Sequence, residues 1–426
     1  MKLKSVKQVC KINLYFELKC LERNRIGEKM LANNLMWSII LFFIQPIFII
    51  GFLYAIFNRN KRVQYTRETF RVNFKRDNFE LKDYFLKGIV PGVILSIVSV
   101  VAGIPVTVEW YVVYQVLTIV LLLIGGSRLI HPLFTFPLSM IALYGLNFFD
   151  IGLPVHWVDR FIQQSTFTLG ETMNHLPDLS VNLLIFASII LLITTFVMNS
   201  EEKYKIFPIL KSSKRGKTVA KYQKKSLWTL PLLVVVPGEI IEPFAEWWPL
   251  FNLNGNQYAF LILPILVGFH YTVLTQLLEE ATSRLQKEFR YLAGLGIVLA
   301  AIAYFYPVVS EIAVAVLLIV GGIVLIRHRR RENMWSFRYG PADDGLRVIA
   351  VREDSPGERL DLSIGDIVLD LNDHQLVNTK EYNKVLATNR SYIKMRIRRK
   401  DGEIIITETP LYDNDHNNLG ILLLDK

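Results

Sequence analysis

The feature that most constrains this chain is a series of apolar runs, each close to the length of a membrane span, separated by basic segments. A bilayer core about 30 Å thick needs roughly 20 apolar residues for each helical crossing. The composition agrees, because 52% of the 426 residues are hydrophobic and only 20% are charged. We therefore predict an α-helical polytopic membrane protein with about seven to nine spans.

Nine runs are candidate spans, and together they place a transmembrane domain at residues 36–326. The sixth is short and interrupted by prolines, so it could instead be a re-entrant segment. The runs are Met36–Phe57, Leu86–Ile104, Trp110–Gly126, Leu129–Phe149, Val181–Met198, a run from Leu227 containing Pro231, Pro237 and Pro243, Tyr258–Leu274, Leu292–Tyr306 and Ile312–Ile326.

The distribution of charge predicts an orientation. With nine spans, the segments at 58–85, 199–226, 275–290 and from 327 onward fall on one side, and these are the basic ones. Positive segments mark the cytoplasmic side. A basic segment at 1–35 would then lie outside and break the rule, so its translation is uncertain, and Met30 or Met36 could be the true start.

The net charge of +10 comes in blocks beside apolar runs. Membrane topology and anionic lipid explain such blocks better than nucleic acid does, and we expect no nucleic-acid partner. The basic segments 58–83 and 203–225 either contact anionic lipid or only set orientation. Cys10 and Cys20 precede the first run and indicate neither a disulfide framework nor a metal site, and we expect no cofactor.

Composition changes at Asn333, after which apolar runs shorten to strand length and turn residues appear. The alternation and turn signals predict a small α/β domain at residues 333–426. Strands are expected at GLRVIAV (Gly345–Val351), IVLDL, YIKMRIRR, EIIITE and LGILLL, and helices at GERLDL and Asn378–Ala387.

The stretch VREDSPGERLDLSIGDIVLDLN, from Val351 to Asn372, is similar to the core of PDZ domains. The match covers about Trp335 to Lys426. Patterning alone also permits another small α/β module. The resemblance implies a five- to six-stranded, partly open barrel with two helices, which binds free C-termini or extended segments by strand addition.

The resemblance also implies where a peptide would bind. The family's carboxylate loop reads apolar-Gly-apolar, which fits Leu419-Gly420-Ile421 and continues into Leu422. The facing helix would contribute Thr379, Lys380, Tyr382 and Leu386. Because this loop lies at the end of the chain, it requires a permuted strand order. The segment Asn333–Pro341 is the competing position, and LGILLL could also be a simple edge strand.

A membrane protein with a peptide-binding tail could be an intramembrane protease, but the sequence lacks the H-E-x-x-H of site-2-type metalloproteases. Gly125-Gly126-Ser127 with His270 meets a rhomboid-like pattern, although a Gly-Gly-Ser helix end is the simpler interpretation. We predict that the chain is not an enzyme.

A transporter is the other active alternative, because ionisable groups in a membrane are usually functional. Glu239, Glu242 and Glu246 stand at helical spacing in the sequence. The neighbouring Trp247 and Trp248 are typical of a membrane interface, where aromatic residues act as anchors.

The order of the parts resembles the MinJ family of division-site topology proteins. The resemblance lies in a first run containing QPIF, the basic segment KRVQYTRETFRVNF, further spans, and one terminal PDZ-like domain with LGI near its end. It implies a scaffold in the cytoplasmic membrane of a Gram-positive bacterium, enriched at septum or poles. The partners it implies are a DivIVA-like polar protein and the MinC/MinD division inhibitor.

Overall fold

The computed structural model describes most of the chain. The described residues are 29–70, 78–149, 176–199, 207–212, 216, 218–243, 245, 247–250, 257–274, 276, 278–334, 339–352, 354–388, 391–412, 415 and 419–425. Cys10, Cys20, nearly all of the uncertain segment 1–35 and most of the acidic segment 150–180 lie outside these ranges.

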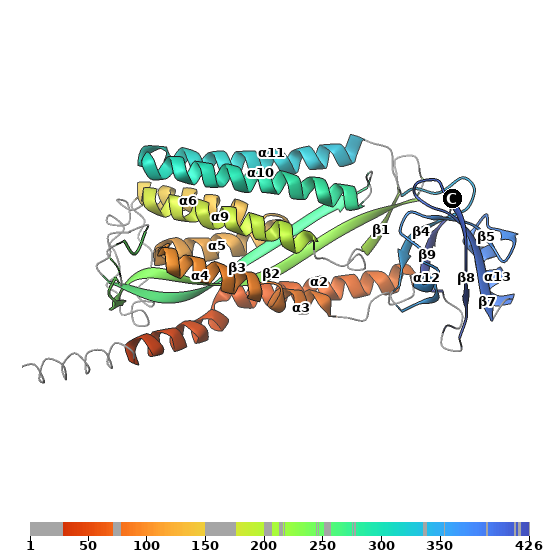
Figure 1. Ribbon diagram of the computed structural model, residues 1–426, viewed down its shortest axis with the longest axis horizontal. Coiled ribbons are helices and arrows are strands. Elements are labelled where there is room, and N and C mark those ends of the chain that lie inside the picture. The colour runs from red at the N-terminus through yellow and green to blue at the C-terminus, as the bar shows by residue number, and fades with distance from the viewer. Residues whose placement is uncertain are drawn as a thin grey trace, which may run out of the picture.

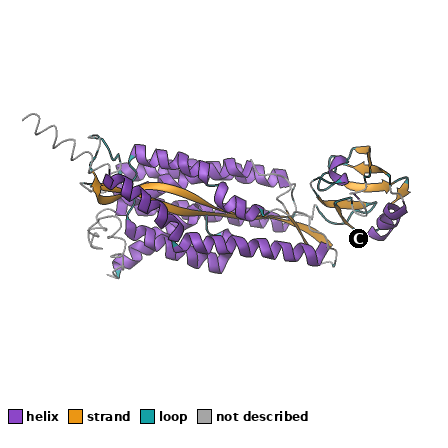
Figure 2. Ribbon diagram, turned by 90° about the horizontal axis from the view of Figure 1, so that it is seen from below, coloured by secondary structure: helices purple, strands orange, loops and turns teal. Residues whose placement is uncertain are grey.

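Long apolar helices form the larger part of the molecule (Figures 1 and 2). Five of those described are long and apolar enough to cross a bilayer, or six if Lys29–Ile44 and Pro46–Thr69, which meet at a 40° bend, form one span. The labelled helices of this region, spanning or not, are α2 (Pro46–Phe70), α3 (Phe79–Leu86), α4 (Ile89–Ala102), α5 (Val108–Gly125), α6 (Pro132–Phe148), α9 (Leu176–Asn199), α10 (Leu278–Phe305) and α11 (Ser310–Met334).

The prediction of helical spans six and seven is wrong. These runs are strands β2 (Thr218–Ile241) and β3 (Tyr258–Val273), which pair as a long antiparallel hairpin. The hairpin runs lengthwise between the helices (Figure 1). Most side chains of β3 are buried, so protein surrounds this non-helical backbone. At membrane depth, strands outside a barrel require such shielding.

The prolines that argued against a helical span fit the hairpin. Pro231 of β2 faces Pro264 of β3 directly in the register. Leu233, two residues after Pro231 on β2, points its backbone groups away from β3. Its N–H donates to the Ser96 hydroxyl at 2.8 Å. Pro231 and Pro264 therefore occupy positions whose N–H would point outward. The absence of that N–H leaves no unsatisfied donor there.

Helix α4 closes the outer edge of β2 with a row of small residues. A Cβ on Gly88 would lie 1.8 Å from the Thr229 carbonyl oxygen, and one on Gly92 would lie 2.6 Å from the Pro231 carbonyl oxygen. One turn further on, Ser96 supplies the hydroxyl that accepts from Leu233. The spacing of four residues places all three on one helix face. Only side chains this small let the helix approach the strand.

Side chains from the helical region close the outer edge of β3. Phe260 N–H donates to Asn34 Oδ1 at 3.1 Å, and the Ser38 hydroxyl donates to the Phe260 carbonyl at 2.8 Å. Further along, Leu266 N–H donates to the Tyr114 hydroxyl at 3.1 Å. Backbone groups that lack a third strand are thus satisfied by the surrounding helices, as an apolar environment demands.

A hairpin replaces two spans without changing the expected side of any basic segment. β2 runs away from the end of the helical region where β1 (Phe207–Ser212) lies, and β3 returns to that end (Figure 1). The charged second half of α2 and the first turns of α10 lie at the same end, and both are helical rather than loops. The two strands run in opposite directions along the helical region, as two consecutive helical spans would.

The C-terminal region forms an antiparallel sheet in the order β8-β7-β5-β4-β9, with β6 paired to β5. Every predicted strand and helix of this region is confirmed. The elements are β4 (Leu346–Val351), α12 (Pro356–Arg359), β5 (Ile367–Leu371), β6 (His374–Gln375), α13 (Thr379–Thr388), β7 (Tyr392–Arg398), β8 (Ile404–Pro410) and β9 (Ile421–Leu424).

Strand β2 also connects the two regions. The Tyr222 hydroxyl donates to the Ile349 carbonyl of β4 at 2.8 Å. Its ring meets that of Tyr339 edge to face, with 4.6 Å between the centroids, and Ala220 N–H donates to the Tyr339 carbonyl at 3.0 Å. The hairpin therefore extends from the helices to the base of the C-terminal sheet (Figure 1).

Candidate functional site

Strand β9 lies at one edge of the C-terminal sheet. It pairs with β4 on one side, and no other described strand pairs with its second side. Because strand residues alternate between faces, Ile421 packs into the domain core whereas Leu422 and Leu424 pack toward the core of the helical region. Because β9 pairs with β4, the first and last strands of the domain are neighbours. This is the permuted order that the carboxylate-loop hypothesis required.

The turn that enters β9 depends on Gly420. Its φ is +69°, a left-handed conformation that glycine adopts without steric cost. A Cβ at this position would lie 2.4 Å from the Ser355 Cβ. The carbonyls on either side are held, since Gly357 N–H donates to Leu419 O at 2.8 Å and Arg352 N–H donates to Gly420 O at 2.7 Å. The sequence thus builds a fixed, tight loop in front of an edge strand.

Helix α13 is fixed at the other end of β9. The backbone N–H and the hydroxyl of Thr379 both reach Asp425 Oδ2, at 3.2 and 2.7 Å. A carboxylate at a helix N-terminus also complements the helix dipole. Tyr382 and Leu386 are buried in the same core cluster as Leu419 and Ile421. Burial raises the pKa of the Tyr382 phenol, which therefore stays neutral.

The structure brings together most of the predicted peptide-binding residues but not all of them. Thr379, Tyr382, Leu386, Leu419, Gly420 and Ile421 belong to one arrangement of helix, loop and edge strand. Lys380 is exposed on α13, and Leu422 faces the opposite side of the sheet, toward the helical region. Leu422 is therefore better placed to dock the domain than to contact a ligand in the groove.

The competing segment Asn333–Pro341 lies elsewhere. Its first residues end α11, residues 335–338 are outside the described ranges, and Tyr339 is buried against Tyr222 of β2. Sequence reasoning missed two residues of this arrangement of helix, loop and edge strand, Asp425 and Ser355. An aspartate near the chain end carried no signal, and Ser355 was recognised only as the start of a helix.

The protease pattern does not form a dyad. Ser127 is buried, and within the described ranges its hydroxyl has no hydrogen-bond partner. His270 accepts through Nδ1 from Arg128 Nε at 3.1 Å, and its Nε2 does not bond to Ser127. A general base must reach the hydroxyl whose proton it takes, and this imidazole is bonded to a guanidinium instead.

The helical spacing inferred for the three glutamates is also wrong. Glu239 lies in β2, Glu242 follows the end of that strand and is exposed, and Glu246 is outside the described ranges. Trp248 is buried and donates from Nε1 to the Val100 carbonyl at 2.8 Å, whereas Trp247 is exposed. Within the described part of the chain, no group of three or more His, Cys, Asp or Glu residues is arranged to hold a metal ion.

Comparison with known proteins finds a relative along nearly the whole chain. The cell division topological determinant MinJ of Bacillus subtilis (strain 168) is 26% identical over 392 residues, which cover 92% of this chain and 95% of that protein. The chain is MinJ-like. The similarity includes both the helical region and the C-terminal sheet, since it covers nearly the whole length of each protein.

Other comparisons cover less of the MinJ-like chain. Probable cell division topological determinants MinJ of Lacticaseibacillus paracasei and Lacticaseibacillus casei (strain BD-II) are each 24% identical over 221 residues, covering 51% of this chain and 58% of theirs. No protein-family model matches the chain. The PDZ domain of the SdrC-like protein from Listeria monocytogenes aligns with 19% of this chain and 90% of that one, at 16% identity and a TM-score of 0.17.

Proposed function

We propose that the chain is a membrane-anchored scaffold that helps to determine where the cell divides. The observation that carries this proposal is the similarity to a cell division topological determinant along nearly the whole of both chains. The apolar helices would fix the protein in the cytoplasmic membrane, with several crossings and enrichment at septum or poles. The C-terminal region, residues 333–426, would lie in the cytoplasm as a PDZ domain.

The working surface would be the groove between β9 and α13. Its support is an edge strand that pairs with one strand alone among the described residues, a tight glycine loop at its start and a helix fixed near its end. An extended peptide would add to β9 as a further strand, and its terminal carboxylate would lie at Leu419–Ile421. Thr379, Lys380, Tyr382 and Leu386 would form the helical wall, and Leu422 would act from the opposite face.

The partners would be proteins with free C-termini or extended segments. We infer from the MinJ-like identification that these include a DivIVA-like polar protein and a MinD-like component of the MinC/MinD inhibitor. The scaffold would then bring the inhibitor to the membrane site that the polar protein marks. No step of this role requires catalysis or a cofactor.

Localisation tests the role of the whole chain. A fluorescent fusion of the full-length protein should concentrate at septa or poles, and deletion should disturb cell length or septum placement. The matched control is a fusion lacking residues 333–426, which should remain in the membrane but lose the septal enrichment. Uniform fluorescence of the full-length protein in cells that divide normally would refute the proposal.

A glycine pair tests the groove itself. In Gly420→Ala the added Cβ strains a left-handed turn and collides with Ser355, so capture of partners from crosslinked membranes should fall strongly. Gly402→Ala is the control. It has φ +94° in the β7–β8 turn and open space around the added Cβ. Both substitutions carry a left-handed penalty of about 1–2 kcal/mol, so equal loss of capture would argue against a groove function.

A further inference from the structure

A cavity of about 150 Å³ lies at the end of the helical region that carries the basic segments. Its walls come from α2, α3, the turn Gly126–Arg128 after α5, β1 and β2, and it is lined in part by Ala55, Lys61, Ser127, Lys225 and Leu227. Such a volume is below the roughly 300 Å³ of small-molecule pockets and suits a single compact group.

The cavity lies where the apolar part of α2 ends. Leu53 and Phe57 are exposed by 57% and 58% on α2, as expected of side chains that face lipid. Asn58 and Lys61, the next turn of the same helix, line the cavity. The surface of α2 therefore changes from apolar to cationic at the cavity, which is the character of a membrane interface.

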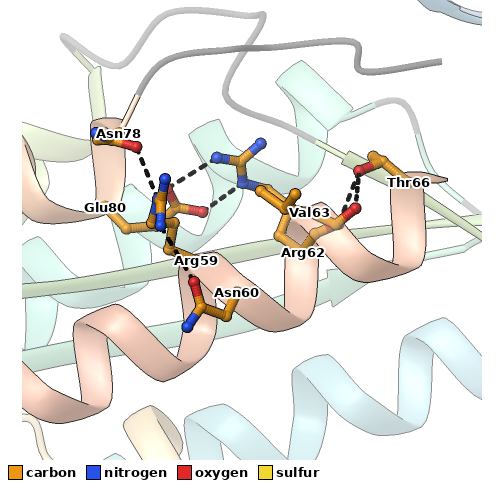
Figure 3. Close-up of polar contacts among 7 residues, drawn as sticks. All are labelled: Arg59, Asn60, Arg62, Val63, Thr66, Asn78 and Glu80. Carbon is orange, nitrogen blue, oxygen red and sulfur yellow. Dashed lines mark hydrogen bonds and ion pairs between the residues drawn. The ribbon is translucent and has the colours of Figure 1, made fainter.

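The acidic residues of the cavity are already neutralised by their own partners. Arg62 bonds to both carboxylate oxygens of Glu80, with Nη2 to Oε2 at 3.0 Å, and this pair joins α2 to α3 (Figure 3). Asp83 pairs with Lys87 at 2.8 Å. Within the described ranges, no carboxylate lies within ion-pair distance of Lys61 or Lys225, the two remaining lysines of the lining.

Other cations surround these lysines. Burial lowers the pKa of Lys225, and repulsion by Lys61, Arg128 and Lys221 lowers it further. Arg128 directs its guanidinium to an imidazole nitrogen rather than to an acid. A bound anion would relieve this repulsion and would stabilise the charged form of the lysine.

An unpartnered hydroxyl also lines the cavity. Ser127 is 2% exposed, and among the described residues its Oγ has no hydrogen-bond partner. A buried hydroxyl without a partner costs about 1–3 kcal/mol. A phosphate oxygen in the cavity could accept from Ser127 and pair with both lysines.

We propose that this cavity binds the phosphate group of an anionic phospholipid from the adjoining leaflet, held by Lys61, Lys225 and Ser127. The lipid source is favoured over a free phosphate because the lining is partly apolar and continues from a lipid-facing helix. This site is separate from the groove between β9 and α13, and either could fail without the other.

Thermal unfolding of the purified full-length protein in a neutral detergent tests the proposal, because a ligand that binds the folded protein raises its unfolding temperature. Short-chain phosphatidylglycerol should stabilise the protein, and short-chain phosphatidylcholine should not. Inorganic phosphate should bind at the same site at least about tenfold more weakly, because it lacks the acyl contacts. Equal affinity for phosphate would overturn the lipid assignment, and equal stabilisation by phosphatidylcholine would overturn the anion site.

Two double variants distinguish binding at this cavity from a general effect of the protein's net charge. Lys61→Gln with Lys225→Gln should weaken phosphatidylglycerol binding by about tenfold or more, because two charged contacts are lost. Lys82→Gln with Lys287→Gln removes two exposed lysines that do not line the cavity, and should change binding by less than about twofold. Equal effects of the two double variants would reduce the proposal to bulk electrostatics.

Two single variants keep the test valid if the double variant does not fold. Lys61 is exposed, so Lys61→Gln should leave unfolding without lipid unchanged and still weaken binding severalfold. Ser127→Ala should also weaken binding, and it should leave the lipid-free protein at least as stable as before, because the lost hydroxyl was buried and had no partner among the described residues. Unchanged binding in both would refute the proposal.

Discussion

The chain contains two sheets whose edges have different surroundings. In the β2–β3 hairpin, helices and their polar side chains occupy both outer edges, from Ser96 on one side to Asn34 and Tyr114 on the other. In the C-terminal sheet, β9 pairs with β4 alone among the described strands. The hairpin lies among apolar helices, where an unsatisfied backbone group is costly, whereas the edge of β9 is the surface for which we propose peptide binding.

The comparison teaches that a strand edge can serve as structure or as a binding surface, depending on what surrounds it. The hairpin edges are closed by a helix that approaches at glycine positions and by serine, asparagine and tyrosine side chains. The β9 edge instead lies between a tight loop at Gly420 and a helix fixed through Asp425. Variants at each edge should therefore have different consequences.

The largest effect is expected at the row of small residues on α4. In Gly92→Leu the side chain would collide with the Pro231 carbonyl, 2.6 Å from the added Cβ, and force the helix away from the strand. We expect a loss of about 3 kcal/mol or more in unfolding free energy, because neither backbone can yield easily. Thermal unfolding in detergent measures it.

The control for this prediction is Gly294→Leu on α10, where nothing lies within 4 Å of the added Cβ. It should be close to neutral, since it adds the same side chain at a helical position with open space. Equal destabilisation by both variants would mean that the close contact between α4 and β2 is unimportant.

A smaller loss is expected when the edge of β3 is left unsatisfied. Tyr114→Phe removes the hydroxyl that accepts from Leu266 N–H and leaves a buried donor without a partner. The cost should be about 1–3 kcal/mol. Tyr291→Phe, at a position that is 78% exposed, should have no measurable effect on the same unfolding curve. A neutral Tyr114→Phe would show that water or another group replaces the hydroxyl.

At the edge of β9, the expected loss of stability is smaller and is confined to the first turn of α13. Asp425→Ala removes the acceptor of both Thr379 bonds and should cost about 1 kcal/mol. Hydrogen exchange should accelerate in the first turn of α13 and not in β7. Glu403→Ala, an exposed carboxylate before β8, is the control. Unchanged exchange at Thr379 and its neighbours would contradict the role of Asp425.

The smallest effect is expected where the two sheets meet. Tyr222→Phe removes the bond to Ile349 O but keeps the ring contact with Tyr339, so about 0.5–1 kcal/mol should be lost. Limited proteolysis should detect faster cleavage next to Tyr339 while cleavage within the β2–β3 hairpin stays unchanged. Tyr392→Phe, on the exposed face of β7, serves as the control. No change in cleavage would mean that the ring alone docks the domain.

Much of the C-terminal region could be predicted from the sequence because its signals are local. Ser355-Pro356, Gly365-Asp366 and the Asp-Gly turn at Gly402 each fix a backbone conformation within a few residues. Strand alternation and helix spacing then place the elements between these turns. The candidate groove followed from the same signals, except for Asp425 and the outward direction of Leu422, which depend on packing.

The sequence by itself determined that the chain is largely apolar, which segments lie on one side, and where the C-terminal elements begin and end. Only the tertiary structure decided that the runs from Leu227 and Tyr258 are strands. A fully buried strand and a buried helix are both continuously apolar, so periodicity could not separate them. What selects the hairpin is the set of contacts from distant helices that satisfy its edges, and no local pattern encodes those contacts.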